Sequence, residues 1–148
     1  MNEFDFYFSF YGLLLGLSAA EVANGLANSI SSRRVVRIGA LTPLLALFVL
    51  LDITSFWMWA WASKANVSIS WGLMIGGLAV ALTYYLAAAL IFPRKADEWL
   101  ILDEHYWAHK KFVVGGVTVA NLLSTGFTFY KHPPAVLDII WIIWMAAY

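Results

Sequence analysis

The chain has 148 residues and no cysteine, with 62% hydrophobic and 12% charged residues and a formal net charge of zero. Globular domains average about 45–50% apolar and about 25% charged residues, so this composition indicates a protein embedded in a membrane. The charge balance argues against a basic surface for nucleic acid, and the lack of cysteine excludes disulfides, thiolate metal ligands and thiol nucleophiles. We expect one domain over residues 1–148.

Four hydrophobic stretches are long enough to cross a bilayer as helices, which takes about 20 apolar residues. They cover residues 6–30, 38–61, 70–92 and 112–130. A fifth stretch, 135–148, is apolar on every face, but about 14 residues reach only about 21 Å, against a hydrocarbon core of about 30 Å. The N-terminal sequence MNEFDF has no Lys or Arg, unlike a cleavable signal peptide, so the first span is expected to remain in the protein. The sequence therefore predicts an all-α, polytopic membrane bundle with four transmembrane helices and a short fifth C-terminal hydrophobic helix.

Positive charge is unevenly divided among the loops between these spans. The first and third loops together hold seven Lys and Arg residues, whereas the second and fourth hold two. The positive-inside rule therefore places the first and third loops in the cytoplasm and the N-terminus outside. The outer ends of the second and third spans are flanked by tryptophans, as in an interfacial aromatic belt: Trp57, Trp59, Trp61 and Trp71.

The third loop, residues 93–111, is the only extended polar segment, and it mixes acids and bases with aromatic residues and leucines. We interpret it as a helix in the cytoplasmic interface, with the option of continuing into the fourth span. It contains His105 and His109 at i, i+4, a spacing that holds a metal when a third ligand comes from elsewhere. The third histidine, His132, is expected on the other side of the membrane. We therefore expect interfacial histidines and no cofactor, with a metal site at His105 and His109 as the lesser alternative.

The first span has two distinct faces on a helical wheel of 100° per residue. One face carries Glu21, Asn24 and Asn28, and the opposite face begins with Gly12 and Gly16 in the sequence GLLLG. Small residues let helix backbones approach closely in lipid, and polar side chains hydrogen-bond across helices. The first span is therefore expected to be a central helix of the bundle.

The other spans carry matching features. Gly72 and Gly76 form a second GxxxG pattern in the third span. Counted from the cytoplasmic ends at about 1.5 Å per residue, Glu21, Thr83 and Asn121 lie about 14–15 Å deep and Asp52 roughly 6–7 Å further out. The sequence thus predicts that polar groups from four helices converge near the middle of the membrane.

An ionised side chain at the bilayer centre costs about 2.5–3.5 kcal/mol on insertion scales. No Lys or Arg lies within a span to neutralise Glu21 or Asp52, so each acid must be protonated, bind a cation or face water. The alternative is structural: a protonated acid that hydrogen-bonds a neighbouring helix, worth about 0.6 kcal/mol on average.

Two functional hypotheses follow. In the first, the protein conducts or transports protons, cations or a small solute, with Glu21 and Asp52 as titrating or ligating groups and Asn24, Asn28, Thr83 and Asn121 as supporting contacts. In the second, it is a non-catalytic accessory or assembly subunit of a larger membrane complex. An intramembrane metal enzyme is a remote third, and we expect no enzymatic activity. The expected partners are membrane lipids and either further copies of the chain or other membrane subunits, in a plasma membrane of the bacterial inner-membrane type.

Overall fold

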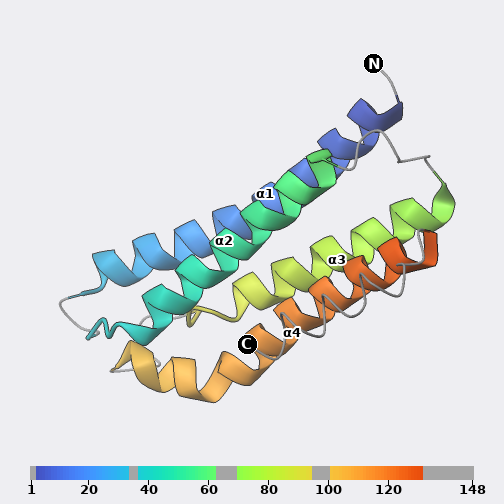
Figure 1. Cartoon of the computed structure of the whole chain (residues 1–148). Helices are drawn as coiled ribbons and strands as arrows, with labels where there is room; N and C mark the ends of the chain where they lie inside the picture. The colour runs from blue at the N-terminus through green and yellow to red at the C-terminus, as the bar shows by residue number, and fades with distance from the viewer. Residues whose placement is uncertain (1–2, 34–36, 63–69, 95–100, 132–148) are drawn as a thin grey trace.

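The computed structural model describes residues 3–33, 37–62, 70–94 and 101–131. These residues form four α-helices: α1 (Glu3–Ser31), α2 (Leu41–Ala62), α3 (Trp71–Ala89) and α4 (Leu102–Lys131). Successive helices run in alternating directions along one bundle (Figure 1). The expected all-α class is confirmed for the described part of the chain, where no strand is found.

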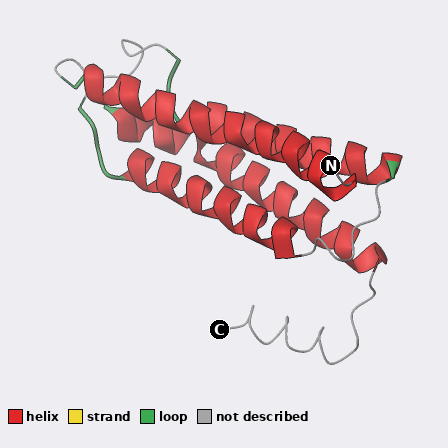
Figure 2. Ribbon diagram, turned by 90° about the horizontal axis from the view of Figure 1, so that it is seen from above, coloured by secondary structure: helices red, strands yellow, loops and turns green. Residues whose placement is uncertain are grey.

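The helices pack in the cyclic order α1, α3, α4, α2. Extensive contacts join α3 to both α1 and α4, while α2 contacts α1 and α4 and makes only a small contact with α3. The view along the perpendicular direction shows the same side-by-side packing (Figure 2). Because α1 and α3 point the same way, as do α2 and α4, each helix lies between one parallel and one antiparallel neighbour.

Three described helices are long and apolar enough to cross a membrane: Asp5–Ser31, Leu41–Ala62 and Trp71–Ala89. They match the first three expected spans. The fourth expected span lies in α4, which is outside this set, so the count of four spans stays a prediction. The fifth stretch lies outside the described residues.

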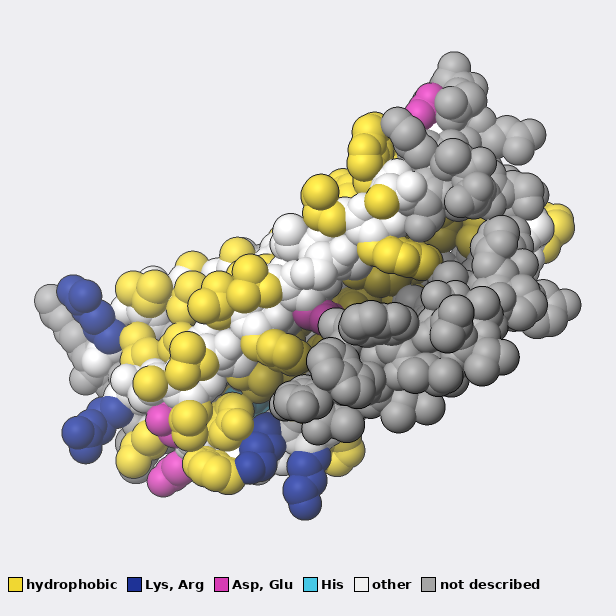
Figure 3. Space-filling model, viewed as in Figure 1, with side chains coloured by type: hydrophobic (Ala, Val, Ile, Leu, Met, Phe, Trp, Pro, Cys, Tyr) yellow, Lys and Arg dark blue, Asp and Glu magenta, His cyan; other side chains and the backbone are white. Residues whose placement is uncertain are grey.

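The basic loops lie at one end of the bundle, where Lys and Arg side chains gather (Figure 3). Here the backbone N–H of Leu102 donates to the Arg37 carbonyl at 3.1 Å, which joins the first loop to the start of α4. Residues 102–111 are the first turns of α4, so the expected interfacial segment does continue into the helix that contains the fourth expected span.

At this basic end, side chains of α4 contact the backbone at the start of α2 and at the end of α3. Leu41 and Thr42, at the start of α2, donate their backbone N–H groups to Asp103 Oδ1 at 3.1 and 3.4 Å. Pro43 has no N–H group and sits in the first turn of α2, where a helix needs none. At the end of α3, His105 Nε2 lies 3.1 Å from the Leu90 carbonyl.

Aromatic side chains fill the other end of the bundle. Tyr7 and Tyr11 of α1 stack with ring centroids 5.4 Å apart, and Tyr11 contacts Phe56 of α2 at 5.7 Å. Trp57, Trp59 and Trp61 are exposed by 37–48% and Trp71 by 85%, so these four indoles lie on the surface of this end, as an interfacial belt requires.

Candidate functional site

An acidic side chain sits halfway along α2 and is hydrogen-bonded by two other helices. The Tyr84 hydroxyl of α3 donates to Asp52 Oδ2 at 2.6 Å. The Asn121 amide of α4 donates to Asp52 Oδ2 at 3.1 Å and to Oδ1 at 3.3 Å. We call Asp52, Tyr84 and Asn121 the carboxylate cluster.

The inner faces of the three helices hold this cluster in place. Val49 and Ile53 of α2 are buried, and Asp52 lies beside them at the edge of that stripe. Tyr84 is completely buried in α3 (0% exposed). Asn121 follows the buried Ala120 in α4 and also donates to the Val117 carbonyl at 3.1 Å, which fixes its amide in the direction of Asp52.

The cluster lies where α2 and α4 are in contact. Asp52 is partly buried, Asn121 is exposed and Tyr84 is buried, so the cluster runs from the surface of the bundle into its interior. On the face drawn in Figure 3, acidic side-chain atoms appear at mid-length of the bundle as well as at its ends. In this cluster the Asp52 carboxylate accepts hydrogen bonds from two neutral donors, and these bonds offset part of the free energy that desolvating a carboxylate costs.

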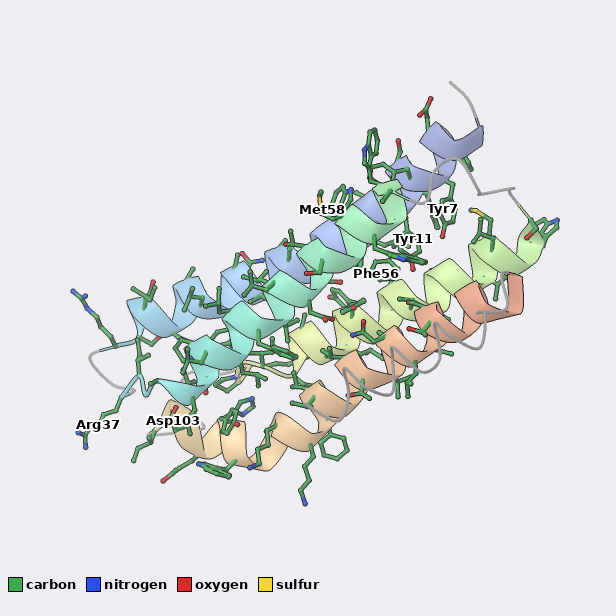
Figure 4. All side chains as sticks on the ribbon, viewed as in Figure 1. Tyr7, Tyr11, Arg37, Phe56, Met58 and Asp103 are labelled. Carbon is green, nitrogen blue, oxygen red and sulfur yellow. The ribbon has the colours of Figure 1, made fainter. Side chains whose placement is uncertain are left out.

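An aromatic column leads from the cluster toward the tryptophan end. Phe56, one turn beyond Asp52, has its ring 5.9 Å from Tyr84 and 5.7 Å from Tyr11. Tyr11, Phe56 and Tyr7 lie close together in the stick view (Figure 4). Aromatic rings therefore pack next to the cluster on the side toward the tryptophan end, which we expect to face outward.

Sequence reasoning found two of the three cluster residues. Asp52 was expected roughly 6–7 Å further out than Asn121, and the structure brings the two side chains together. Tyr84 was missed because an aromatic residue in an apolar span indicates only core packing. The neighbouring Thr83, expected in its place, turns its hydroxyl to the Ala79 carbonyl of its own helix at 2.8 Å.

Glu21, Asn24 and Asn28 do not join the cluster. Asn24 and Asn28 are exposed and Glu21 is partly buried. None of the three side chains makes a hydrogen bond to any other part of the chain that the structure describes. The buried stripe of α1 consists instead of Tyr7, Tyr11, Leu15, Ser18, Val22 and Ser29. Depth placed Glu21 in the same layer as Asn121, but its direction around α1 separates it from the cluster.

The glycines divide into tightly packed and open positions. A Cβ atom on Gly12 would lie 3.0 Å from the Trp57 ring, and one on Gly77 would overlap the Tyr11 ring. A Cβ on Gly16 or Gly76 meets nothing within 4 Å, and one on Gly72 meets only the Ser70 hydroxyl. Of the four glycines expected to mediate helix packing, only Gly12 does so within one chain. The tightest glycine contacts are instead those of Gly39 with Asp103, Gly25 with Phe92 and Gly77 with Tyr11.

The two histidines of α4 have structural contacts. The carbonyl of Leu90 can only accept, so His105 Nε2 carries the hydrogen between them. The imidazoles of His105 and His109 stack with centroids 4.1 Å apart, and His109 Nδ1 lies 3.1 Å from the His105 carbonyl. Among the described residues, no group of three or more His, Cys, Asp or Glu side chains is placed to hold a metal ion.

The described residues thus form a helical bundle in which three helices are long and apolar enough to cross a membrane, with a hydrogen-bonded carboxylate halfway along α2. Comparisons with protein-family models, with curated proteins and with solved structures find no match to this chain.

Proposed function

We propose that the protein is an integral membrane protein that binds and passes a proton or a small cation at the carboxylate cluster. The supporting observation is the hydrogen-bonded Asp52. It lies 11 residues from the start of the 22-residue helix α2, about 16 Å from either end and hence near the bilayer centre.

Asp52 has no described cationic side chain as a hydrogen-bond partner, which favours neutralisation of its carboxylate by an exchangeable proton or cation. Both described donors to the carboxylate, Tyr84 and Asn121, are neutral. The described Lys and Arg side chains lie in the loops and in the first turns of α4, toward the basic end. A carboxylate in hydrocarbon without a basic partner is neutralised by a proton or a bound cation, or faces water in a cavity. The carboxylate is only partly buried where α2 and α4 meet, so an exchangeable proton or cation need not be enclosed by the four helices.

We also propose the orientation, with the N-terminus outside and the first and third loops in the cytoplasm. The contact between Arg37 and Leu102 supports it, because the two cation-rich loops lie at the same end. The α-helical spans favour a plasma membrane of the bacterial inner-membrane type over an outer membrane, whose spanning proteins are β-barrels.

The test is flux across proteoliposomes with a pH-sensitive dye inside and a potassium diffusion potential. Wild-type protein should acidify or alkalinise the lumen according to the sign of the potential, and D52N should abolish this flux because it removes the charge and keeps the shape. E21Q is the matched control, since it neutralises the other carboxylate of a span and Glu21 has no described contact with the cluster. Wild-type vesicles that hold proton, sodium and potassium gradients as well as empty ones, or equal flux with D52N, would contradict the proposal.

A second candidate function, a non-catalytic accessory or assembly subunit, is favoured by a different observation. The side chains of Asn24 and Asn28 point away from the bundle within a membrane span, where another helix would satisfy them. A larger protein that copurifies in fixed stoichiometry in mild detergent would support this function over transport.

A further inference from the structure

The groups that face the Asp52 carboxylate are hydrogen-bond donors. The Tyr84 hydroxyl donates to Oδ2 at 2.6 Å, and the Asn121 amide nitrogen donates to Oδ2 at 3.1 Å and to Oδ1 at 3.3 Å. The hydrogens of these donors carry partial positive charge and point at the carboxylate oxygens. A metal cation bound between Asp52 and these two groups would therefore face hydrogens where it needs lone pairs.

The amide of Asn121 is held in this orientation by its own helix. The same nitrogen, Nδ2, also donates to the Val117 carbonyl at 3.1 Å. Turning the amide over would place its oxygen, which can only accept, against that carbonyl oxygen, and the hydrogen bonds to Val117 and Asp52 would both be lost. Asn121 is therefore fixed as a donor, and its amide oxygen is turned away from Asp52.

The Tyr84 hydroxyl is constrained by burial. Tyr84 is completely buried (0% exposed), and Asp52 is the acceptor of its hydroxyl hydrogen. To offer a lone pair to a metal cation, the hydroxyl would have to turn that hydrogen away from Asp52 and into the apolar interior. A buried donor that loses its acceptor costs free energy, which opposes this rearrangement.

Backbone carbonyls at this level are also engaged. Membrane proteins that hold Na⁺ or K⁺ offer it carbonyl oxygens from unwound helices or filter loops. The helices α2, α3 and α4 run without a break through Asp52, Tyr84 and Asn121, so the carbonyls beside the cluster accept from N–H groups of their own helices. Hydroxyl groups near the cluster likewise donate to carbonyls of their own helices: Ser55, Thr83, Thr118 and Ser124.

A proton, in contrast, needs one lone pair and no coordination shell. Oδ1 of Asp52 is the less engaged oxygen, with one hydrogen bond at 3.3 Å, whereas Oδ2 accepts two at 2.6 and 3.1 Å. A proton taken up at Oδ1 converts the side chain to a neutral carboxylic acid and leaves both hydrogen bonds at Oδ2 in place. Release of the same proton restores the carboxylate, so the cluster accommodates both forms with little rearrangement.

The titratable side chains that face Asp52 are phenols. They are Tyr84 of α3 and, beyond the ring of Phe56, Tyr11 of α1. The other described charged side chains lie toward the ends of the bundle, apart from Glu21, which makes no described hydrogen bond to the cluster. The charge of the Asp52 carboxylate is therefore left to a proton to neutralise.

We infer that the ion bound and released by Asp52 is a proton, and that Na⁺ and K⁺ are not held at the carboxylate cluster. This inference rests on the proposed function and narrows it to one ion.

Infrared difference spectroscopy of the protein in bilayers reads the carboxyl group directly and does not depend on transport. A step in pH at fixed salt should produce bands of carboxylic acid and carboxylate that are lost in D52N and retained in the matched control E21Q. Exchange of choline for sodium or potassium at fixed pH should produce none of these D52N-sensitive bands. Such bands on sodium or potassium exchange, or their absence on every pH step at which the bundle stays folded, would overturn the inference.

Tracer flux separates this inference from the proposed function. Wild-type vesicles should take up radioactive sodium or rubidium no faster than D52N vesicles, while their proton flux exceeds that of D52N. Sodium or rubidium uptake that D52N abolishes would overturn the inference and leave the proposed function standing. A lack of flux for every ion would contradict the proposed function, and the infrared bands would still decide which ion Asp52 binds.

Discussion

The capping of α2 by Asp103 gives the sharpest test of how this bundle is held together. Asp103 Oδ1 accepts from the backbone N–H groups of Leu41 and Thr42, and the residue before them, Ala40, has no side chain that could do so. Gly39 is close by: a Cβ atom on it would overlap the Asp103 carboxylate. The first loop and α4 are therefore expected to be energetically coupled through this one side chain.

The magnitudes follow from the geometry. D103A leaves two helix N–H groups without a partner, and the loss of an N-cap side chain costs about 0.5–2 kcal/mol of unfolding free energy. The loss of a carboxylate at the positive end of the helix dipole adds about 0.3–1 kcal/mol, so we expect about 1–3 kcal/mol in all. D103N keeps an acceptor oxygen and loses only the charge, so it should cost less than D103A.

A double-mutant cycle isolates the contact. In the wild type, G39A should destabilise the protein by about 1–3 kcal/mol, because overpacking against Asp103 displaces the cap. In the D103A background the obstructing carboxylate is gone, so G39A should cost less by at least about 1 kcal/mol.

The measurement is reversible unfolding by SDS titration in mixed micelles, followed by far-UV circular dichroism. Amide hydrogen exchange at Leu41 and Thr42 should also become faster in D103A. Equal destabilisation by G39A in both backgrounds, or unchanged unfolding and exchange in D103A, would refute the reasoning.

Two further predictions use neighbouring residues as matched controls. G77A should destabilise the bundle by about 1–3 kcal/mol, because the added methyl group would overlap Tyr11. G76A, at an open position of the same helix, should be neutral or stabilising by up to about 1 kcal/mol, because alanine has the better helix propensity. Equal SDS midpoints for the two variants would contradict this packing. Y84F removes the hydroxyl that donates to Asp52 at 2.6 Å and should lower the unfolding free energy by about 1–3 kcal/mol in the same titration. Y85F, at an exposed ring, should stay within about 0.5 kcal/mol of the wild type. A Y84F variant as stable as Y85F would show that this hydrogen bond does not hold the cluster together.

The sequence alone determined where the helices lie along the chain and which of their ends carry the charged and the tryptophan residues. Hydropathy and length are local properties, so the first three spans were located to within a few residues. The helix α2 begins three residues later than expected, where Asp103 accepts hydrogen bonds from its first N–H groups. The depth of a residue in its span is also local, which is why Asp52 and Asn121 were both placed toward the middle of the membrane. Loop charge and the positions of the tryptophans are read directly from the chain.

Tertiary packing alone decided which side chains meet. A helical wheel fixes the direction of Glu21 relative to Ser18 but not the rotation of α1 against its neighbours. That rotation is set by close contacts such as those of Gly77 with Tyr11 and Gly25 with Phe92. Those contacts turn Glu21, Asn24 and Asn28 away from the cluster and bring Tyr84 into it, although no pattern in the third span distinguishes Tyr84 from a core residue. Partners around a helix depend on how whole helices fit together, and that fit is a property of the assembled bundle.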